Sequence, residues 1–275
     1  MKRTLAIIGG GRVGRALGRR LAESGWAVGP VVARSARSAL AAVRAIGTGM
    51  PHDALAAEIV GARLILIAVP DDAIAAVARR LARRAPHGSL AGCVVLHTSG
   101  AVPSAALDPL ARRGASIASM HPLQTFSAGV RSRLVGVTFA IEGQPRACRL
   151  ARSLARELGA KPTIIHPDAK ALYHAAGAFA SPHVLAALAA GTAMLEKAGF
   201  RERDARSALL RLARQTLENY ERLGAKRSWT GPVSRGDHAT IRRHEAALKK
   251  LPAEFLAAYR ALTKLQVRLL RSATR

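Results

Sequence analysis

Apolar residues along the first half of the chain fall into two alternating patterns. Short apolar runs of strand length are followed by segments in which apolar residues recur every three or four positions, as on one face of a helix. The predicted strands are residues 4–8, 27–33, 63–69, 92–97, 116–119 and 134–141, and the predicted helices include 36–46, 53–60, 71–84, 103–112 and one ending near 158. Strands and helices that alternate at these lengths indicate a mostly parallel sheet with helices on both faces.

The second half of the chain has a purely helical pattern. Asp168 is expected to start its first helix, with a side chain that caps free backbone N–H groups. The pattern then continues to the C-terminus with few breaks. The breaks lie near Gly199, near Gly224 and across residues 229–237. The sequence therefore predicts two domains: residues 1–160, which hold the sheet, and residues 161–275, which are helical.

A glycine-rich turn follows the first predicted strand. Residues 4–8 lead directly into Gly9-x-Gly11-x-x-Gly14, and a helical pattern begins there. This context is typical of a dinucleotide-binding fingerprint, in which the glycines permit a tight turn, a close pyrophosphate and close packing of the helix on the sheet. The free N–H groups at the helix start attract phosphate. The turn residues expected to contact the cofactor are Gly9, Gly11, Arg12, Val13 and Gly14.

The residues after the second predicted strand indicate which dinucleotide binds. NAD-binding units usually place an Asp or Glu there to hold the ribose 2′-hydroxyl. Here the strand ends in Arg34-Ser35-Ala36-Arg37, and residues 25–51 contain no acidic residue. Because arginine can bind a 2′-phosphate in bidentate fashion, we expect NADP(H), with Arg34, Ser35 and Arg37 around that phosphate. The alternative is that these arginines only reflect an arginine-rich composition.

The net charge of +26 raises nucleic acid as a partner. However, the basic residues are spread along all 275 residues in short pairs, and aromatic residues make up only 4% of the chain, which argues against binding by base stacking. Solvated helix faces are the interpretation we favour, and a nucleic-acid role is unlikely on this composition. The positive field would also attract an anionic substrate.

The sequence predicts a cytoplasmic protein without a metal site. Cys93 and Cys148 have neither metal-type spacing nor the pattern of a disulfide framework. The first apolar run stops at Gly9, which is too short for the apolar region of a signal peptide. We also expect no stretch long and apolar enough to span a membrane.

Ligands of such sheets bind beyond the carboxyl ends of the strands, so the residues that directly follow the strands are candidates for the functional site. Those expected to contact the cofactor are Ala68, Val69, Pro70 and Thr98. The hydroxyl of Ser99 could touch nicotinamide or substrate, or Ser99 could simply end its strand. His121, held by the proline after it, could lie near the site or be structural.

The start of the helical half carries three ionisable groups. Lys170 and His174 share one face of the predicted helix, and Tyr173 lies close to that face. A Lys or His whose pKa is tuned by burial suits a proton donor beside a carbonyl or imine that receives hydride. Ordinary polarity at a helix start would explain the same residues. Arg235, in a polar interruption between helices, could face an anionic substrate.

Several motifs together resemble one bacterial family. They are Gly9-x-Gly11-x-x-Gly14, Ala68-Val69-Pro70-Asp71, His97-Thr98-Ser99-Gly100-Ala101, His121-Pro122-Leu123-Gln124-Thr125-Phe126, Lys170-x-x-Tyr173-His174 and Thr230-Gly231-Pro232-x-x-Arg235-Gly236-Asp237. Members of that family join a Rossmann-like NADP-binding domain to a helical C-terminal domain of unknown function. The resemblance covers essentially the whole chain.

That family is distantly similar to pyrroline-5-carboxylate reductases, 6-phosphogluconate and 3-hydroxyisobutyrate dehydrogenases, ketopantoate reductases and deazaflavin-dependent NADP reductases. The resemblance implies an α/β fold, in which a Rossmann-like parallel-sheet domain precedes an all-helical domain like that of 6-phosphogluconate dehydrogenase. In the hydroxyacid members a Lys-x-x-x-Asn pair carries acid–base work. Lys170-x-x-x-His174 occupies a similar place, with His where Asn is usual. Pro182, where the family tends to have Asn, is expected to kink its helix.

We therefore expect an NADP(H)-dependent oxidoreductase that transfers hydride to or from a small anionic carbonyl, imine or alcohol between the two domains. Lys170 is the expected acid or base, His174 and Ser99 would orient the reacting atom, and His121 is a further candidate. The long apolar helices predict a homodimer. The alternative is a non-catalytic NADP-binding sensor or partner module. Substrate, reaction direction and a deazaflavin redox partner stay open.

Overall fold

The computed structural model describes residues 3–127 and 132–273, and the chain divides into two compact units, Met1–Ser181 and Pro182–Arg275. The division falls later than the boundary expected after residue 160. The reason is that β8 (Lys161–Ile164) completes the sheet of the first unit, and α6 (Lys170–Ala180) is tied to that sheet by a buried lysine.

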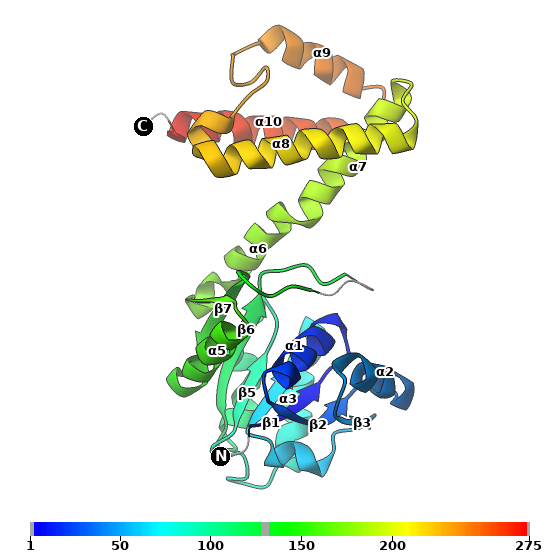
Figure 1. Ribbon diagram of the computed structural model, residues 1–275. Helices are drawn as coiled ribbons and strands as arrows, with labels where there is room; N and C mark the ends of the chain where they lie inside the picture. The colour runs from blue at the N-terminus through cyan, green and yellow to red at the C-terminus, as the bar shows by residue number, and fades with distance from the viewer. Residues whose placement is uncertain (1–2, 128–131, 274–275) are drawn as a thin grey trace. The chain divides into compact units, whose positions relative to one another are not determined.

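The first unit is built on one eight-stranded sheet with the strand order β3-β2-β1-β4-β5-β6-β7-β8 (Figure 1). The other strands are β1 (Thr4–Ile8), β2 (Ala27–Val32), β3 (Met50–His52), β4 (Leu64–Ile67), β5 (Val94–His97), β6 (Ser116–Pro122) and β7 (Thr138–Gly143). Only β6 and β7 pair antiparallel among the described strands. The predicted mostly parallel sheet is confirmed, and the strand order reverses beside β1, where ligands of such sheets bind.

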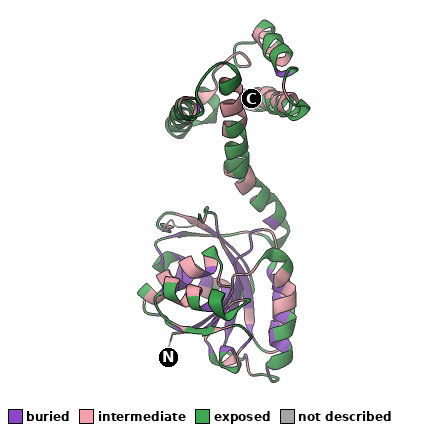
Figure 2. Cartoon of the chain, turned by 90° about the vertical axis from the view of Figure 1, so that its right-hand side faces the viewer, coloured by how far each residue is buried: buried purple, intermediate pink, exposed green. Residues whose placement is uncertain are grey.

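Each face of the sheet has its own hydrophobic core. Leu5 and Ile7 of β1 belong to one core and Ala6 and Ile8 to the other, as the period of two in a strand requires. Buried residues are concentrated in the strands and on the inner faces of the helices (Figure 2). A strand buried on both faces reads as a continuous apolar run, and this explains why the sequence predicted these strands so clearly.

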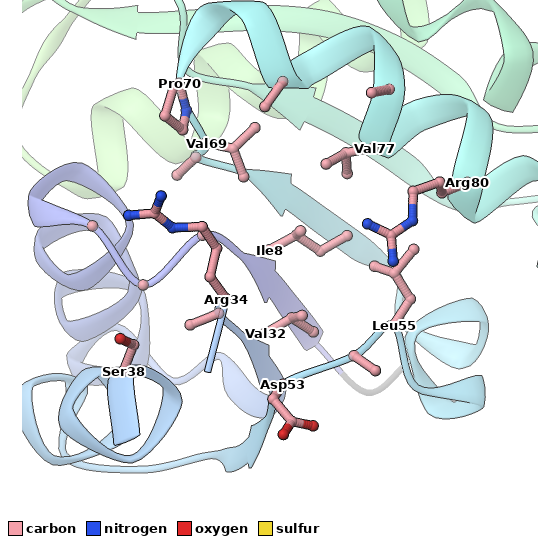
Figure 3. A pocket seen from close by; sticks show the side chains of 18 of the residues that line it. Ile8, Val32, Arg34, Ser38, Asp53, Leu55, Val69, Pro70, Val77 and Arg80 are labelled. Atoms are coloured by element: carbon pink, nitrogen blue, oxygen red, sulfur yellow. The ribbon is translucent and has the colours of Figure 1, made fainter. Parts of the chain in front are cut away.

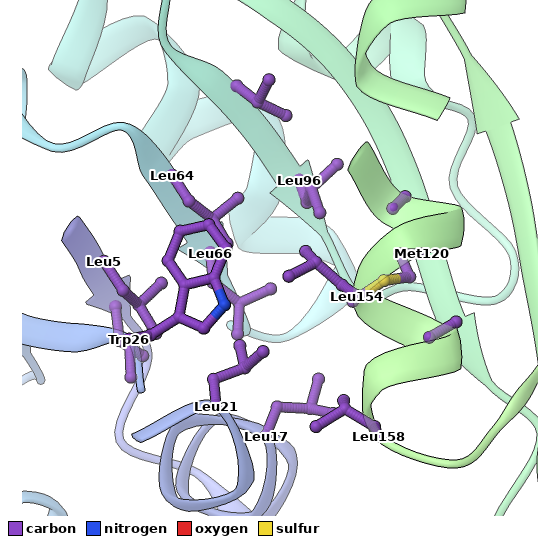
Figure 4. Close-up of a cluster of buried hydrophobic side chains, with 14 of the residues drawn as sticks. Leu5, Leu17, Leu21, Trp26, Leu64, Leu66, Leu96, Met120, Leu154 and Leu158 are labelled. Carbon is purple, nitrogen blue, oxygen red and sulfur yellow. The ribbon is translucent and has the colours of Figure 1, made fainter. Parts of the chain in front are cut away.

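Helices cover both faces. The helices are α1 (Arg12–Glu23), α2 (Ala36–Ile46), α3 (Asp71–Arg84), α4 (Asp108–Ala111), α5 (Pro145–Glu157) and α6, with 3-10 turns η1 (Ala57–Gly61), η2 (Ser104–Leu107) and η3 (Pro167–Ala169). Figure 4 shows the first core, in which Leu17 and Leu21 of α1 and Leu154 of α5 gather beside strand leucines. The second core packs α3, η1, η2 and α4 on the opposite face.

Several local details differ from the sequence prediction, and one of them is that β7 begins at Thr138 where a strand was expected from residue 134. The short strands β3 and β8 were not expected, and the helix expected from residue 53 is only the 3-10 turn η1. Asp168 was expected to cap a helix, and this was wrong. Pro167 starts η3 one residue earlier, so Asp168 lies inside that turn and its backbone N–H donates to Nδ1 of His166 at 3.4 Å.

The second unit consists of helices. They are α7 (Pro182–Lys197), α8 (Glu202–Ser228), α9 (His238–Leu248) and α10 (Ala253–Ala273). α7 packs on α8, and α10 packs on α8 and α9. Gly199 and Gly224 have positive φ angles of 97° and 72°, which explains the predicted breaks. The break expected at Pro182 is confirmed, because α6 ends at Ala180 and Pro182 starts α7.

One helical run is apolar enough to cross a membrane by length and composition alone. It is Pro167–Lys197, with a mean hydropathy of 1.5 in a window of which none is buried. The expectation that no such stretch exists is therefore wrong. The break at Ser181 divides this run into helices of 11 and 16 residues, each shorter than the roughly 20 residues of a spanning helix. The run therefore presents apolar side chains that the single chain leaves uncovered.

Candidate active site

The glycine turn after β1 is packed so closely that side chains are excluded. Gly9 has a φ of 120°, and a Cβ there would lie 2.2 Å from the carbonyl oxygen of Ala68. A Cβ on Gly14 would lie 2.1 Å from the carbonyl oxygen of Gly9. Gly9 therefore makes the tight turn and Gly14 brings α1 against it, the mechanical roles that the spacing predicted.

The N-terminus of α1 is open to a ligand. Its N-cap is Gly11, which offers no side-chain cap for the free N–H groups of the first turn. A Cβ on Gly11 would meet nothing nearer than the carbonyl oxygen of Ala68 at 4.0 Å. Unpaired N–H groups and the positive end of the helix dipole thus face open space, an arrangement that suits a phosphate.

A cavity of about 700 Å³ lies at these strand ends (Figure 3). It is lined by the glycine turn and by apolar side chains such as Ile8, Val32 and Val77. Arg34, which follows β2, stands on one side of the cavity, and Arg80 of α3 stands on the other (Figure 3). The cavity therefore combines an apolar wall with a cation on each of two opposite sides.

The cavity contains about half of the residues predicted to bind a cofactor. Those that line it are Gly9, Gly11, Arg34, Ala68, Val69 and Pro70, whereas Arg12, Val13, Gly14, Ser35, Arg37 and Thr98 do not. Ser35 instead caps α2, where its Oγ accepts the backbone N–H of Ser38 at 3.2 Å. Sequence reasoning missed four polar lining residues, Arg15, Ser38, Asp53 and Arg80. The first-turn spacing of Ser35 and Ser38 could have indicated which serine caps and which faces the cavity.

A second cluster of polar side chains lies next to this cavity along the sheet. β4 and β5 are adjacent, and the backbone N–H of Thr98 donates to the carbonyl oxygen of Ile67 at 3.1 Å. The segment after β5 therefore runs beside residues 68–70, which line the cavity. Ser99 and Gly100 therefore lie close enough to the cavity to contact a ligand that extends from it along the strand ends.

Lys170 lies at the base of this cluster and is only 1% exposed. Its Nζ donates to the carbonyl oxygen of Ser99 at 3.0 Å and to Oγ of Ser119 at 2.5 Å, and lies 3.7 Å from Oε1 of Glu142. Burial lowers the pKa of Lys170, and the carboxylate of Glu142 opposes that effect. Of the residues expected at the reacting end, Lys170 and Ser99 are therefore in direct contact.

His121, Tyr173 and His174 form the outer part of the cluster. Nδ1 of His121 is 2.8 Å from the hydroxyl of Tyr173, and the rings of His121 and His174 meet edge to face with centroids 5.8 Å apart. A Cβ on Gly100 would lie 2.6 Å from Cδ2 of His174 and 3.0 Å from Nε2 of His121. The missing side chain of Gly100 thus lets both rings approach the segment after β5.

Burial controls the protonation of these groups. It lowers the pKa of His121 to about 4, with further lowering by His174 and by Lys170, and it raises the pKa of Tyr173 to about 12. At neutral pH His121 is therefore neutral and Tyr173 keeps its proton. Which of the two groups donates in their contact depends on the tautomer of the imidazole, and the tautomer whose Nδ1 accepts from Tyr173 carries its proton on Nε2, beside Gly100.

Sequence reasoning missed two further members of the cluster. Glu142 and Ser104 are both buried, and the local pattern does not mark Ser104 as functional. The signal that could have found Glu142 is an acidic residue directly after the apolar run 139–141. Arg235, a candidate for binding an anionic substrate, lies in the second unit in the loop before α9.

Two family models match the chain. Residues 1–122 match a Rossmann-like domain, and residues 137–266 match the domain of unknown function DUF2520. No curated protein matches the sequence. The two matches follow one another along the chain in the order that the motif resemblance predicted.

Solved structures share the fold over nearly the whole chain. A Thermotoga maritima protein is 22% identical with a TM-score of 0.72, covering 98% of this chain and 100% of that one. A reductive aminase from Aspergillus terreus, in complex with NADPH and ethyl-5-oxohexanoate, is 20% identical with a TM-score of 0.72, covering 98% and 94%. Pyrroline carboxylate reductase from Plasmodium falciparum, with NADP bound, is 12% identical with a TM-score of 0.61, covering 98% and 100%.

At these identities the solved structures establish a common fold, while the two family models account for most of the sequence. The chain therefore joins a region that matches a Rossmann-like domain to a region that matches DUF2520.

Proposed function

We propose that this protein is an NADP(H)-dependent oxidoreductase that transfers hydride to or from a small carbonyl, imine or alcohol. The observation that carries the proposal is the cavity beside the glycine turn, where the uncapped start of α1 and the guanidinium of Arg34 offer separate sites for phosphate. The reductive aminase and the pyrroline carboxylate reductase that share this fold have NADPH or NADP bound.

The residues present fit a phosphorylated dinucleotide. The free N–H groups after Gly11 suit the pyrophosphate, and Arg34 suits the 2′-phosphate. The apolar wall suits the adenine and ribose rings. Ser38 lines the cavity near Arg34 and takes the place that was expected for Ser35 (Figure 3). When bound, the cofactor would supply or accept the hydride at the nicotinamide ring.

The proton comes from the cluster beside the cavity. We assign the proton of the His121 imidazole to Nε2, next to Gly100, so that Nδ1 accepts from the hydroxyl of Tyr173. In reduction, Nε2 gives its proton to the reacting oxygen or nitrogen while Nδ1 takes the proton of Tyr173, which solvent then restores. His174 borders the same space. The acid–base role expected of Lys170 is an untested alternative to this relay, and its ammonium is engaged by Ser99, Ser119 and Glu142 inside the unit.

The substrate class and setting remain parts of the proposal. A net charge of +26 favours an anionic substrate through long-range attraction. A cytoplasmic location follows from the sequence analysis and forms part of the same hypothesis. The alternative is a non-catalytic NADP-binding sensor or partner module. It would use the same cavity, but it assigns no role in catalysis to Lys170, His121, Tyr173 and His174.

We also propose a homodimer. The described helices from α6 onward expose large apolar side chains that the single chain leaves uncovered. They include Leu172, Leu185, Leu212, Leu217 and Leu262, each more than half exposed. Exposed apolar area of this extent is typical of an interface between subunits.

The first experiment is a fluorescence titration of the purified protein with NADPH and, separately, NADH. The proposal expects tight NADPH binding and much weaker NADH binding, followed by NADPH oxidation with a carbonyl or imine in a substrate panel. Binding without turnover on any substrate would favour the sensor. The absence of binding by either cofactor would refute both.

A further inference from the structure

One ion pair lies where α6, β6, β7, η2 and the loop after β5 meet in the first unit. Lys170 comes from the first turn of α6 and Glu142 from β7, and both side chains are 1% exposed. Glu142 is opposite Ser119 in the β6–β7 ladder, so the carboxylate and Ser119 share one face of the sheet. Ser119 accepts from Nζ of Lys170, which closes the contact between α6 and the two strands.

The same pair holds both ends of the loop that follows β5. At one end, the carbonyl oxygen of Ser99 accepts from Nζ of Lys170 at 3.0 Å and from Oγ of Ser119 at 3.2 Å. At the other end, Oε1 of Glu142 accepts the backbone N–H of Ser104, and Oε2 accepts its hydroxyl, both at 2.7 Å. The loop between Ser99 and Ser104 includes Gly100, on which the rings of His121 and His174 rest.

We propose that Lys170 and Glu142 form a buried positioning pair, which fixes the Ser99–Ser104 loop under His121 and His174, and that Lys170 acts through this loop without passing its proton to the substrate. Its Nζ donates to the carbonyl oxygen of Ser99 at 3.0 Å and to Oγ of Ser119 at 2.5 Å, and it is paired with Oε1 of Glu142 at 3.7 Å. A proton transfer would therefore break a contact that the loop needs. The expected effect of this pair on turnover rests on the proposed function, whereas its expected effect on stability does not.

Electrostatics explains why both members must be present. A buried charge whose partner is removed is strongly destabilising, whereas replacement of the whole pair by neutral groups is often tolerated. The other titratable groups around Lys170 are Asp71 of α3, His97 of β5 and His121 of β6. Glu142 is the larger of the two attractive influences that support the charge of Lys170, and Asp71 is the smaller.

The test is a double-mutant cycle on the full chain with Lys170→Met, Glu142→Gln and the combined variant. Lys170→Met should lower the melting temperature by about 10 °C, because it leaves the carboxylate unpaired. The combined variant should regain at least half of that loss. If the proposed function holds, NADPH turnover should fall with Lys170→Met and recover at least severalfold in the combined variant. The matched control is the exposed pair of Arg260 and Glu245, 2.7 Å apart, whose variants should change stability little.

The outcomes separate the hypotheses. The combined variant could regain stability while neither it nor the unmodified protein binds NADPH. That result would support the positioning pair and refute the proposed function. Turnover lost equally in Lys170→Met and in the combined variant, with both as stable as the unmodified protein, would overturn the proposal and make Lys170 a catalytic acid.

A second measurement covers the case in which Lys170→Met does not fold. Glu142→Gln keeps the shape of the side chain, removes its charge and replaces one of the two oxygens that accept from Ser104 by an NH2 group, so Lys170 should lose its proton more easily. His97 and His121, with pKa values of about 3 and about 4, stay neutral above pH 7. The stability lost in Glu142→Gln should therefore shrink as pH rises from about 7 to about 10. A Glu142→Gln protein as stable as the original at every pH would overturn the positioning pair.

Discussion

The hydroxyl of Tyr173 lies 2.8 Å from Nδ1 of His121, and this contact joins the first turns of α6 to β6. The second unit contains a pair of the same composition, in which the hydroxyl of Tyr259 lies 2.9 Å from Nδ1 of His244. Both pairs meet edge to face, with ring centroids 5.5 and 5.8 Å apart. The first pair is part-buried beside Lys170 and His174, and the second pair is exposed. The second pair can therefore serve as a control for substitutions in the first.

Tyr173→Phe should remove the proton relay and leave the cofactor cavity unchanged. A positioned general acid contributes roughly 10²–10⁴ in rate, so we expect kcat to fall by about 100-fold with little change in the Kd for NADPH. Steady-state kinetics and a fluorescence titration measure the two quantities. Tyr259→Phe loses the same kind of hydrogen bond and should keep full turnover. Equal turnover in the two variants would remove Tyr173 from the mechanism.

Arg34 should decide between NADPH and NADH. It lines the cavity, whereas Arg37 does not, although the two lie three residues apart on the same segment. A hydrogen bond to a charged group contributes about 1.5–3 kcal/mol, so Arg34→Ala should weaken NADPH binding by roughly 10- to 100-fold. NADH, which lacks the 2′-phosphate, should bind Arg34→Ala as it binds the original protein. Arg37→Ala should leave both affinities unchanged, and a large effect there would show that Arg37 reaches the phosphate.

The fold could be predicted where its causes are local. Strands buried on both faces are continuous apolar runs, and the glycines of the first turn are required by contacts as short as 2.1 Å with the neighbouring backbone. The sequence also placed Arg34 correctly at the end of β2. The prediction assigned Ser35 to the cofactor although Ser35 caps α2 and Ser38 lines the cavity, because the N-cap spacing of the two serines was not used.

The reacting end could be predicted only in part, because its contacts join distant segments. Lys170, His121 and Ser99 were identified singly, each with a structural alternative. Glu142 was missed, since its partners lie 38 and 28 residues away, at Ser104 and Lys170. The antiparallel pairing of β6 and β7 places Glu142 opposite Ser119, and Lys170 of α6 donates to that serine. These contacts join three separate segments, so the sequence of any one segment does not predict them.

Gly100→Ala should displace the two imidazoles. The new methyl group would lie 2.6 Å from the ring of His174 and 2.9 Å from that of His121, closer than such atoms can approach. We expect turnover to fall by more than tenfold while NADPH binding is kept, because the cavity does not include Gly100. Gly61→Ala is the matched control, since a Cβ there would meet nothing within 4 Å. A fully active Gly100→Ala enzyme would show that the rings need not rest on this loop.

The exposed apolar helices predict self-association. Sedimentation or light scattering should give the mass of two chains, about twice 28.9 kDa. Leu217→Glu places a charge at a side chain of α8 that is 61% exposed, and it should shift the equilibrium toward single chains without unfolding them. Arg211→Glu is a matched change on the same helix and tests whether added negative charge alone has this effect. A protein that is monomeric at every concentration would refute the dimer.

His97, which is buried, and His121, which is part-buried, predict that the protein loses stability in acid. Burial lowers the pKa of His97 to about 3 and that of His121 to about 4, from an ordinary value of 6.5. Between pH 6.5 and those values the unfolded chain binds more protons than the folded one, so the free energy of unfolding should fall as pH falls through that window. A full shift for His121 corresponds to roughly 3 kcal/mol, and its partial exposure reduces this to about half. His121→Gln should flatten the dependence of melting temperature on pH, whereas His87→Gln, at an exposed position after α3, should leave it unchanged. If His121→Gln and the original protein lose stability in parallel from pH 6.5 to 4, burial of His121 is not what makes the fold sensitive to acid.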